Sequence, residues 1–402
     1  MTTPTPMPMQ GFPPSSRDQV SLANWRTPPF CHWAFHHVRE VIPTAAIPTD
    51  RSRQGTYEDA QADLSAFSVP GLDGKPLDLA GFLADTTTDG LVVLKDGHRV
   101  FTHYAQGLTQ HQPHILMSVS KSLLGLVAGI LADDGSLDLD ADVLTYLPEV
   151  KATAFAGARI RDLLDMRVGI SFSEDYLATG GAIIAYRKAT NWNPLEPGES
   201  ASDLRSFFGM LTERDGDHGG AFHYVSPNTD LLGWVIERAT GTRYADVFSD
   251  RLWKPLGAAD DAYITVDRNG APRCAGGVCM TVDDLARVGQ MLVDDGVAHD
   301  GTRVVPQSWI DDIETAGDGD AWARGDFAEH FEHAPMHYRA KWYVLRGEAP
   351  MIFGMGIHGQ NLFVDRRNRV VVAKVASQGA PMDVELKRLS TRGGRELIRI
   401  LS

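Results

Sequence analysis

The strongest pattern of apolar and polar positions lies in residues 114–135, which read HILMSVSKSLLGLVAGILADDG. Polar residues open the segment, and apolar residues then follow at the spacing of one helical face, namely Leu124, Val127, Ala128 and Leu131. Two aspartates and Gly135 come next, and a glycine there suits the C-cap of a helix. The pattern therefore predicts a buried helix from about Ser118 to Asp133.

Short β-rich runs occur near both ends of the chain. Residues 90–104, GLVVLKDGHRVFTHY, hold two such runs on either side of Asp96-Gly97, a dipeptide typical of hairpin turns. Further runs of β-branched or aromatic residues occupy 341–345, 360–365 and 370–375, and an amphipathic helix is expected at 383–401. Strands from the two ends of the chain can share one antiparallel sheet.

The middle of the chain is expected to be mostly helical, with long loops. Helical periodicity appears in the segments 203–211, 230–239, 244–253 and 282–293, and shorter helices are expected at 161–166 and within 25–43. Residues 44–80 have little periodicity and indicate a loop.

These elements predict an α+β fold, in which helices flank an antiparallel sheet and a mostly helical lobe is inserted between its strands. Residues 1–20 are rich in Pro, Thr and Ser, so we expect a disordered tail there and a single domain over 21–402. Within that domain the α/β lobe would comprise about 21–115 and 335–402, and the helical lobe about 116–334. A site between the lobes would lie where Ser118 opens its helix.

Composition narrows the classes of partner. With 402 residues, 43% hydrophobic and 22% charged, the chain is an ordinary globular protein, and its net charge of -14 argues against nucleic acid or an anionic membrane as the main partner. Three cysteines fit a reducing compartment, and neither a signal peptide nor a membrane-spanning run is recognisable. We therefore expect a cytoplasmic protein. The sequence does not determine the oligomeric state, and a homodimer is one possibility.

The first candidate for chemistry is the pair Ser118 and Lys121. Residues three apart are neighbours on a helix, so the hydroxyl and the amine could act as nucleophile and base. First-turn N–H groups lack internal partners and can face a developing oxyanion. S-x-x-K alone is a weak signal, and the alternative is a serine N-cap beside an exposed lysine. However, this S-x-x-K is the only one in the chain, and it opens a strongly apolar helix.

The second candidate is Tyr224, in AFHYVSPNTDLLGWVIERATG. A polar, turn-rich stretch precedes an apolar helix here, so Tyr224 and Ser226 are expected on a loop at the helix entrance. A tyrosine held near a lysine ammonium can have a lowered pKa and act as a base. Alone, a tyrosine at such a position is more often a core or interface residue.

The third candidate is residues 353–360, FGMGIHGQ, which contain a literal G-x-G-x-x-G. A dinucleotide site needs a helix after the glycines, whereas NLFVD continues here as a strand, so that interpretation is rejected. The better interpretation is a glycine-rich strand edge where backbone approaches a ligand closely.

Two histidine-rich groups could suggest a metal, but neither favours one. Their members are Cys31, His32, His36 and His37 in one group, and His330, His333 and His337 in the other. The first group has no carboxylate-rich partner motif, and Pro335 interrupts the second, whose acidic neighbours indicate a solvated loop. We predict no metal and no organic cofactor.

In this order, the three candidate segments resemble the serine β-lactamase-like family of penicillin-recognising enzymes and their esterase relatives, most of all the branch of 6-aminohexanoate-dimer (nylon-oligomer) hydrolases. The resemblance spans residues 25–375 and is carried by PPFCHWAFHHVREVIPTAAI, LMSVSKSL, SEDY, YVSPNTDLLGWVIERATG, DDLARVGQML and GIHGQNL. It implies a β-lactamase/transpeptidase-like fold. It also implies a serine hydrolase that cleaves carboxylic esters or linear amides through an acyl-enzyme, without a cofactor.

The resemblance also implies roles for individual residues. Ser118 would be the acylated nucleophile, with Lys121 and Tyr224 as its partners in proton transfer. Backbone N–H groups of Ser118 and Ile357 would form the oxyanion hole. Tyr176, in SEDY, would contact the scissile group and assist the leaving amine. The remaining positions expected to bind substrate are Arg187, Trp192, Ser226, Ala275, Tyr343 and His358.

Some positions depart from the family pattern. Ser226 replaces the asparagine of Y-x-N, as it also does in the nylon-hydrolase branch. Ile357-His358-Gly359 replaces K-T-G, whose lysine helps to hold the β-lactam carboxylate, so β-lactams are less favoured. Arg187, followed by Lys188, stands where this branch uses an acidic residue to attract a substrate ammonium, and Ala275 stands where it can carry asparagine. Both changes affect amide hydrolysis more than ester hydrolysis.

Several functions therefore stay open. The first is a hydrolase of linear amide oligomers and esters. Its alternatives are a short-chain carboxylesterase without useful amidase activity and a D-aminopeptidase or β-lactam hydrolase. An alternative of another class is a penicillin-binding-like sensor that acylates without turnover.

Overall fold

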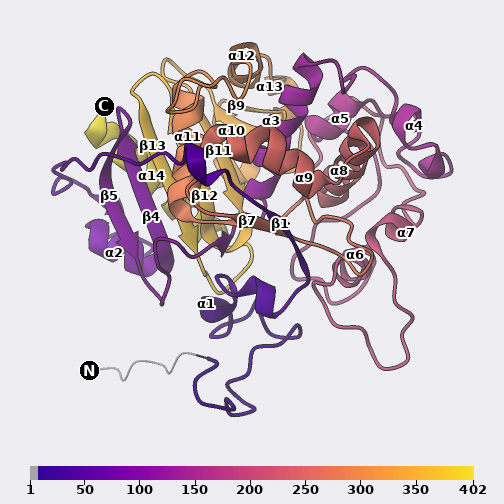
Figure 1. Ribbon diagram of the computed structural model, residues 1–402, viewed down its shortest axis with the longest axis horizontal. Helices are drawn as coiled ribbons and strands as arrows, with labels where there is room; N and C mark the ends of the chain where they lie inside the picture. Colours follow the sequence, from indigo (N-terminus) through magenta and orange to yellow (C-terminus); the bar gives the residue numbers. More distant parts are fainter. Residues whose placement is uncertain (1–7) are drawn as a thin grey trace.

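A seven-stranded antiparallel sheet forms the centre of the molecule (Figure 1). The structure is a computed structural model, and it describes residues 8–402. The strand order is β5-β4-β13-β12-β11-β10-β9. The bounds are β4 Thr88–Lys95, β5 His98–Tyr104, β9 Met336–Arg339, β10 Trp342–Leu345, β11 Met351–Gly356, β12 Gln360–Asp365 and β13 Val370–Ala376. The predicted hairpin and the sharing of one sheet by strands from both ends of the chain are confirmed.

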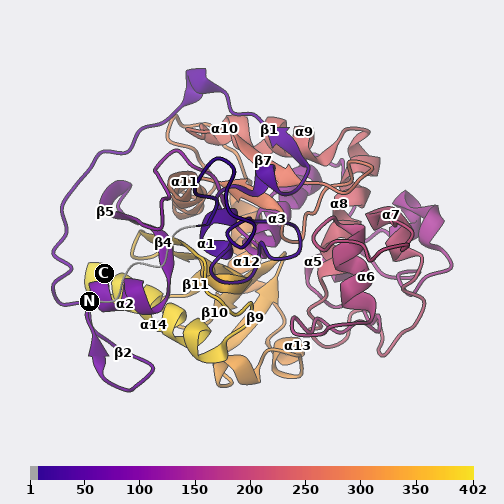
Figure 2. The ribbon, with the colours of Figure 1, turned by 90° about the horizontal axis from the view of Figure 1, so that it is seen from below.

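Helices cover both faces of this sheet. In Figure 2 the sheet lies between α11 (Val282–Val293) and α14 (Val384–Leu401). Successive side chains of a strand point to opposite faces, so Leu362 and Val371 join one apolar core while Phe363 and Val372 join the other. The segment of α11 was expected in the helical lobe, but α11 packs on β13, β12 and β4, and its apolar face completes the core of the sheet.

Helix α3 (Val119–Asp133) connects the sheet to the helical part of the chain. It contacts β11 and β10 on one side and α8 (Ser226–Thr240) and α9 (Tyr244–Phe248) on the other. The other helices of this part are α4 Val143–Tyr146, α5 Ile160–Leu164, α6 Ala182–Ala189, α7 Leu204–Phe208, α10 Lys254–Leu256, α12 Gln307–Thr315 and α13 Gly319–Ala323. The predicted helix at Ser118 is confirmed, and its central position brings its first turn to the edge of the sheet.

A second sheet, which the sequence analysis missed, joins four distant segments in the order β1-β7-β8-β6. Its strands are β1 Thr44–Ile47, β7 Ala262–Thr265, β8 Val278–Met280 and β6 His114–Ile115. Each is only two to four residues long, so period-two alternation is too short to be recognised. The sheet matters for the site because β6 ends shortly before Ser118, and Leu116 N donates to Val278 O at 2.9 Å.

The N-terminal segment folds against this second sheet and α6. The short helix expected within 25–43 consists of α1 (Cys31–Ala34) and a 3-10 turn at Val38–Glu40. Residues 8–20, assigned above to a disordered tail, follow a series of turns in which Met9 N donates to Asp18 O at 2.9 Å. Residues 1–7 lie outside the described residues.

Another missed element pair is the small ladder of β2 (Val69–Pro70) and β3 (Pro76–Leu77), which precedes α2 (Leu79–Asp85) within the expected loop 44–80. Within residues 8–402, the helices are all too short or too polar to cross a membrane.

Candidate active site

Ser118 stands at the N-cap of α3, between β6 and the first helical turn. Met117, directly before it, has a φ of +46°, a conformation that turns the chain sharply into the helix. Ser118 Oγ accepts a hydrogen bond from Lys121 Nζ at 2.9 Å. The lysine is only 1% exposed, so the alternative of a capping serine beside a solvated lysine is wrong.

Burial sets the protonation of Lys121. Desolvation lowers the pKa of its amine to about 7; Glu174 acts in the opposite direction and Arg273 in the same one. Nζ also donates to Ala275 O at 2.7 Å, which fixes the amine next to the serine. Near neutral pH a large fraction of this amine is unprotonated, so it can accept a proton from Ser118.

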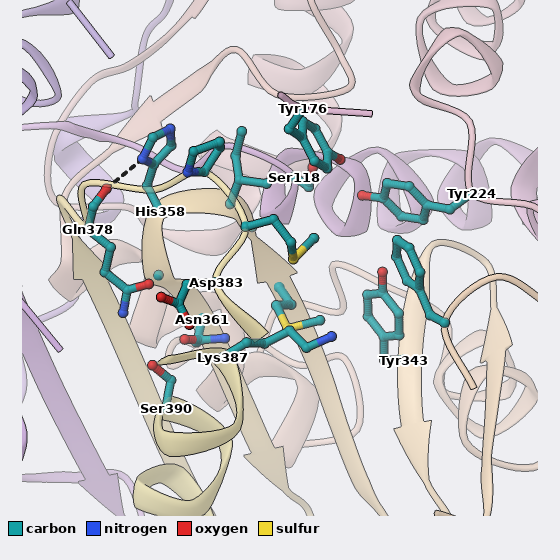
Figure 3. Close-up of a pocket in the computed structure, with 17 residues that line it drawn as sticks. Ser118, Tyr176, Tyr224, Tyr343, His358, Asn361, Gln378, Asp383, Lys387 and Ser390 are labelled. Atoms are coloured by element: carbon teal, nitrogen blue, oxygen red, sulfur yellow. Dashed lines mark hydrogen bonds between the residues drawn. The ribbon is translucent and has the colours of Figure 1, made fainter. Parts of the chain in front are cut away.

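Tyr224 points toward Ser118 from the segment that leads into α8 (Figure 3). Its ring centroid lies 4.9 Å from Lys121 Nζ, and its backbone N donates to Asp326 Oδ2 at 2.9 Å. Burial raises the pKa of the phenol, and hydrogen bonds with Ser118 and Tyr343 offset this only in part. A lowered pKa, which a nearby ammonium can cause in a tyrosine, is therefore not found at Tyr224, because desolvation of the phenolate has the largest effect.

The edge of β11 meets the entry of α3. A Cβ on Gly356 would lie 2.8 Å from Leu116 O and 2.9 Å from Ser118 N, so only glycine fits there. Ile357 follows directly, in a 3-10 turn in which His358 has a φ of +60°. The glycine-rich strand edge was expected to approach a ligand closely, but Gly356 instead approaches the backbone at the start of α3. After the turn at Ile357–Gly359 the chain continues as strand β12 and not as a helix.

Two cavities meet at Ser118, and Tyr176 and Ile357 line both of them. The first, of about 480 Å³, also contains Tyr224, Tyr343 and His358. The second also contains Arg187, Trp192, Ser226 and Ala275. All the site residues expected from the sequence thus line one of the two cavities, apart from Lys121, which lies behind Ser118.

His358 and Lys188 have structural partners. His358 Nδ1 hydrogen-bonds with Gln378 O at 2.6 Å, and burial lowers the pKa of this imidazole to about 4. The neutral ring holds the turn that carries Ile357. Lys188 Nζ pairs with Glu199 Oε2 at 2.5 Å, so its charge is used outside the second cavity.

Glu174 is a residue of the site that the sequence analysis missed. Its carboxylate accepts hydrogen bonds from Ser226 Oγ at 2.5 Å, Ser226 N at 2.8 Å and Tyr176 Oη at 3.3 Å. It lines the second cavity and joins two of the expected substrate-binding residues. The available signal was the acidic residue two positions before Tyr176 in SEDY.

Arginines give the second cavity a positive wall. Arg26, Arg187 and Arg273 line it, the first of them from the N-terminal segment. Arg187 Nη2 donates to Tyr176 O at 3.0 Å, and Arg273 pairs with buried Asp230. Burial, followed by the charges of the other two arginines, lowers the pKa of Arg26 to about 9. Asp230 and Glu174 offset two of these three positive charges, so the cavity keeps a net positive charge, which disfavours an ammonium group and suits a neutral or anionic one.

The first of the two histidine-rich groups makes hydrogen bonds within the protein. His32 Nδ1 hydrogen-bonds with Ser377 Oγ at 2.7 Å, and His36 Nε2 with His32 O at 2.8 Å. Across residues 8–402, His, Cys, Asp and Glu side chains form no group of three or more that could hold a metal ion.

The β-lactamase family model matches residues 80–392, and the chain belongs to this family. It is a serine hydrolase that acts on amides or esters.

Over 371 residues the chain is 35% identical to the 6-aminohexanoate-dimer hydrolase of Paenarthrobacter ureafaciens. The aligned region covers 92% of this chain and 91% of that protein. A protein of Bacillus anthracis assigned as a 6-aminohexanoate-dimer hydrolase has the same fold, with a TM-score of 0.86 at 24% identity over 96% of this chain and 97% of that one. A family VIII carboxylesterase shares the fold at a TM-score of 0.55 and 17% identity, over 78% and 95% of the two chains.

Proposed function

We propose that the chain hydrolyses carboxylic esters and linear amides through an acyl-enzyme on Ser118. The observation that carries this proposal is the hydrogen bond of 2.9 Å between Ser118 Oγ and the amine of Lys121, whose pKa is lowered to about 7. A buried amine that is neutral at working pH is the usual way to activate a serine hydroxyl without a histidine.

In acylation, Ser118 Oγ bonds to the carbonyl carbon while its proton passes to Lys121. The oxyanion accepts hydrogen bonds from the backbone N–H groups of Ser118 and Ile357, each worth about 3–4 kcal/mol in such sites. The tetrahedral intermediate then breaks its bond to the leaving group, which takes a proton from the Tyr224 hydroxyl. The Lys121 ammonium returns a proton to Tyr224, so the raised pKa of the phenol suits it as a proton donor and relay.

In deacylation, water replaces the leaving group. The neutral amine of Lys121 takes a proton as the water oxygen bonds to the acyl carbon. Ser118 Oγ then leaves and takes a proton from the Lys121 ammonium, which releases the acid product and restores the neutral amine. Tyr176 lies beside Ser118 in both cavities, which supports a contact with the scissile group.

For the substrate, we propose a preference for esters and for amides without an ammonium near the second cavity. The charges of Arg26 and Arg187 support this preference. Efficient hydrolysis of a 6-aminohexanoate dimer, whose terminal ammonium would meet this wall, is disfavoured. Esters need less help with the leaving group and are affected less.

The decisive experiment compares wild type with Ser118→Ala on p-nitrophenyl butyrate. We expect sustained turnover by wild type and loss of at least about 10³-fold in the variant. Normal hydrolysis by Ser118→Ala would contradict the proposal. A single burst without turnover by wild type would instead favour the sensor. Adding a linear amide dimer and a chromogenic cephalosporin to the assay separates the substrate classes that remain open.

The cellular location and the oligomeric state are also proposals. We propose a cytoplasmic location, supported by Cys31, Cys274 and Cys279, which are all buried free thiols. A homodimer is the oligomeric state to test first, by size-exclusion chromatography with light scattering.

A further inference from the structure

A second lysine reaches the first cavity from the opposite side to Ser118. Lys387 extends from α14 toward Tyr343 (Figure 3) and lines the cavity that contains Ser118. Its Nζ is buried and lacks a hydrogen-bond partner within residues 8–402. It lies 4.4 Å from the ring centroid of Phe331 and 5.7 Å from that of Phe327. Three unused donors on one buried amine leave room for a ligand with oxygen acceptors.

The acidic residues at the start of α14 have other partners: Glu385 pairs with Arg388. Asp383, one turn before Lys387, caps α14 by accepting hydrogen bonds from the backbone N of Glu385 and of Leu386, both at 3.0 Å. Burial, followed by the charge of Arg388, lowers the pKa of Lys387 to about 7. A bound carboxylate would favour the ammonium form and so offset the cost of burying it.

The surroundings of Lys387 favour an anion on an aliphatic chain. Lys387 also lines a third cavity, of about 760 Å³. The apolar lining of this cavity comprises Phe331, Ala334, Met336, Leu345, Met351 and Phe353. Its basic lining residues besides Lys387 are Arg388, Arg392 and Arg395. Arg388 is paired with Glu385 and Glu332, whereas Arg392 donates to the carbonyl of Pro70, which leaves positive charge at this rim.

We propose that Lys387 binds a carboxylate of the substrate, so that linear esters and amides with a terminal carboxylate on an aliphatic chain are preferred to their neutral counterparts. The inference rests on the proposed hydrolysis at Ser118. The carboxylate can belong to the acyl part or to the leaving group, because both would present the same oxygens to the amine. Lys387 is then a residue that determines specificity in the first cavity, whereas Arg26 and Arg187 line the second.

The test uses two pairs of esters that differ only in a remote carboxylate. For the acyl part, the p-nitrophenyl monoester of adipic acid is compared with the p-nitrophenyl ester of adipamic acid. For the leaving group, 6-(butyryloxy)hexanoate is compared with 6-(butyryloxy)hexanamide. The readout is the ratio of kcat/KM for the carboxylate to kcat/KM for the carboxamide, which cancels general effects of a variant on catalysis.

In wild type we expect this ratio to be about 10–100 in one of the two pairs, which identifies the part that carries the carboxylate. Lys387→Met and Lys387→Gln should bring the ratio close to one, and Lys387→Arg should keep most of it. Lys75→Met, at an exposed lysine paired with Asp73, is the matched control and should leave the ratio unchanged.

A ratio near one in both pairs for wild type, or an unchanged ratio in Lys387→Met and Lys387→Gln, would overturn the proposal. If these variants do not fold, inhibition of wild type decides: hexanoate that inhibits no better than hexanamide overturns it. If wild type hydrolyses no ester at all, the proposed hydrolysis at Ser118 is contradicted, and carboxylate binding by Lys387 is then tested separately. Calorimetric titration of wild type and Lys387→Arg with hexanoate and hexanamide would still report on Lys387.

Discussion

Replacing Lys121 with methionine should remove activity and yet stabilise the protein. Burial lowers the pKa of this amine from 10.5 to about 7. Between these values the unfolded chain holds a proton that the folded chain does not, so the folded state loses relative stability as pH falls through this window. At 1.36 kcal/mol per pH unit, the buried amine costs about 5 kcal/mol at and below pH 7.

Methionine has a similar volume and no charge. It leaves Ala275 O and Ser118 Oγ without their hydrogen bonds from Nζ, each of which contributes about 1 kcal/mol. The net gain in free energy of unfolding should therefore be about 2–3 kcal/mol at pH 7. Because the cost of burial falls by 1.36 kcal/mol per pH unit, the gain should disappear at about pH 9 and become a loss of about 1 kcal/mol at pH 10. Because the base is lost, kcat/KM for p-nitrophenyl butyrate should fall by about 10³-fold or more.

The assay combines urea unfolding at pH 7 and pH 10 with kcat/KM measured from pH 5 to pH 10, using Lys75→Met as the control for a surface lysine. For wild type, kcat/KM should rise with an apparent pKa of about 7 and then level off. A Lys121→Met variant that is less stable than wild type at pH 7 would refute the reasoning on burial. Activity that rises only near pH 10 would contradict the lowered pKa of the amine, because an unburied lysine titrates there.

Three further substitutions test other parts of the site. Gly356→Ala should lower kcat/KM by about 10²-fold, because its Cβ would lie 2.8 and 2.9 Å from backbone atoms at the entry of α3. The control is Gly347→Ala, which has open space around it and should have no effect on kcat/KM. Similar activities of the two variants would contradict this prediction. Glu174→Gln should move the acid limb of the kcat/KM profile to lower pH, because the carboxylate raises the pKa of Lys121; a limb that stays or moves up would contradict the assignment. Arg187→Asp should raise kcat/KM for 6-aminohexanoate dimer by roughly tenfold, because it replaces a like charge with an opposite one; the absence of any gain would count against the positive wall.

Local patterns were sufficient to predict the hairpin at Asp96-Gly97 and the helix that begins at Ser118, since each depends on periodicity or turn chemistry within a few residues. The four-stranded sheet was missed, because its strands are held by pairing between distant segments and not by their own alternation. Glu174 and Lys387 were missed for a similar reason. A carboxylate in a loop and a lysine on an amphipathic helix have ordinary surroundings in the sequence, and only the fold directs them to Ser118.

The pKa of Tyr224 is another property that the sequence alone did not predict. A nearby lysine can lower the pKa of a tyrosine, but the folded protein buries the Tyr224 phenol and raises its pKa. Burial depends on packing by distant segments, and the hydrogen bonds that offset it in part come from residues as far apart as Ser118 and Tyr343. The proposed catalytic residues could therefore be inferred from motifs, whereas the proposed direction of proton transfer rests on the packing.

The N-terminal segment has a consequence for how the activity of this chain can diversify. Trp25 packs against Trp192 with ring centroids 5.2 Å apart, and Arg26 lines the second cavity beside it. Both residues precede the region matched by the family model, which begins at residue 80. This stretch of chain thus contributes to the lining of the cavity. Exchange of this stretch between relatives would be a modular route to new substrate preferences, with the reaction chemistry inherited unchanged.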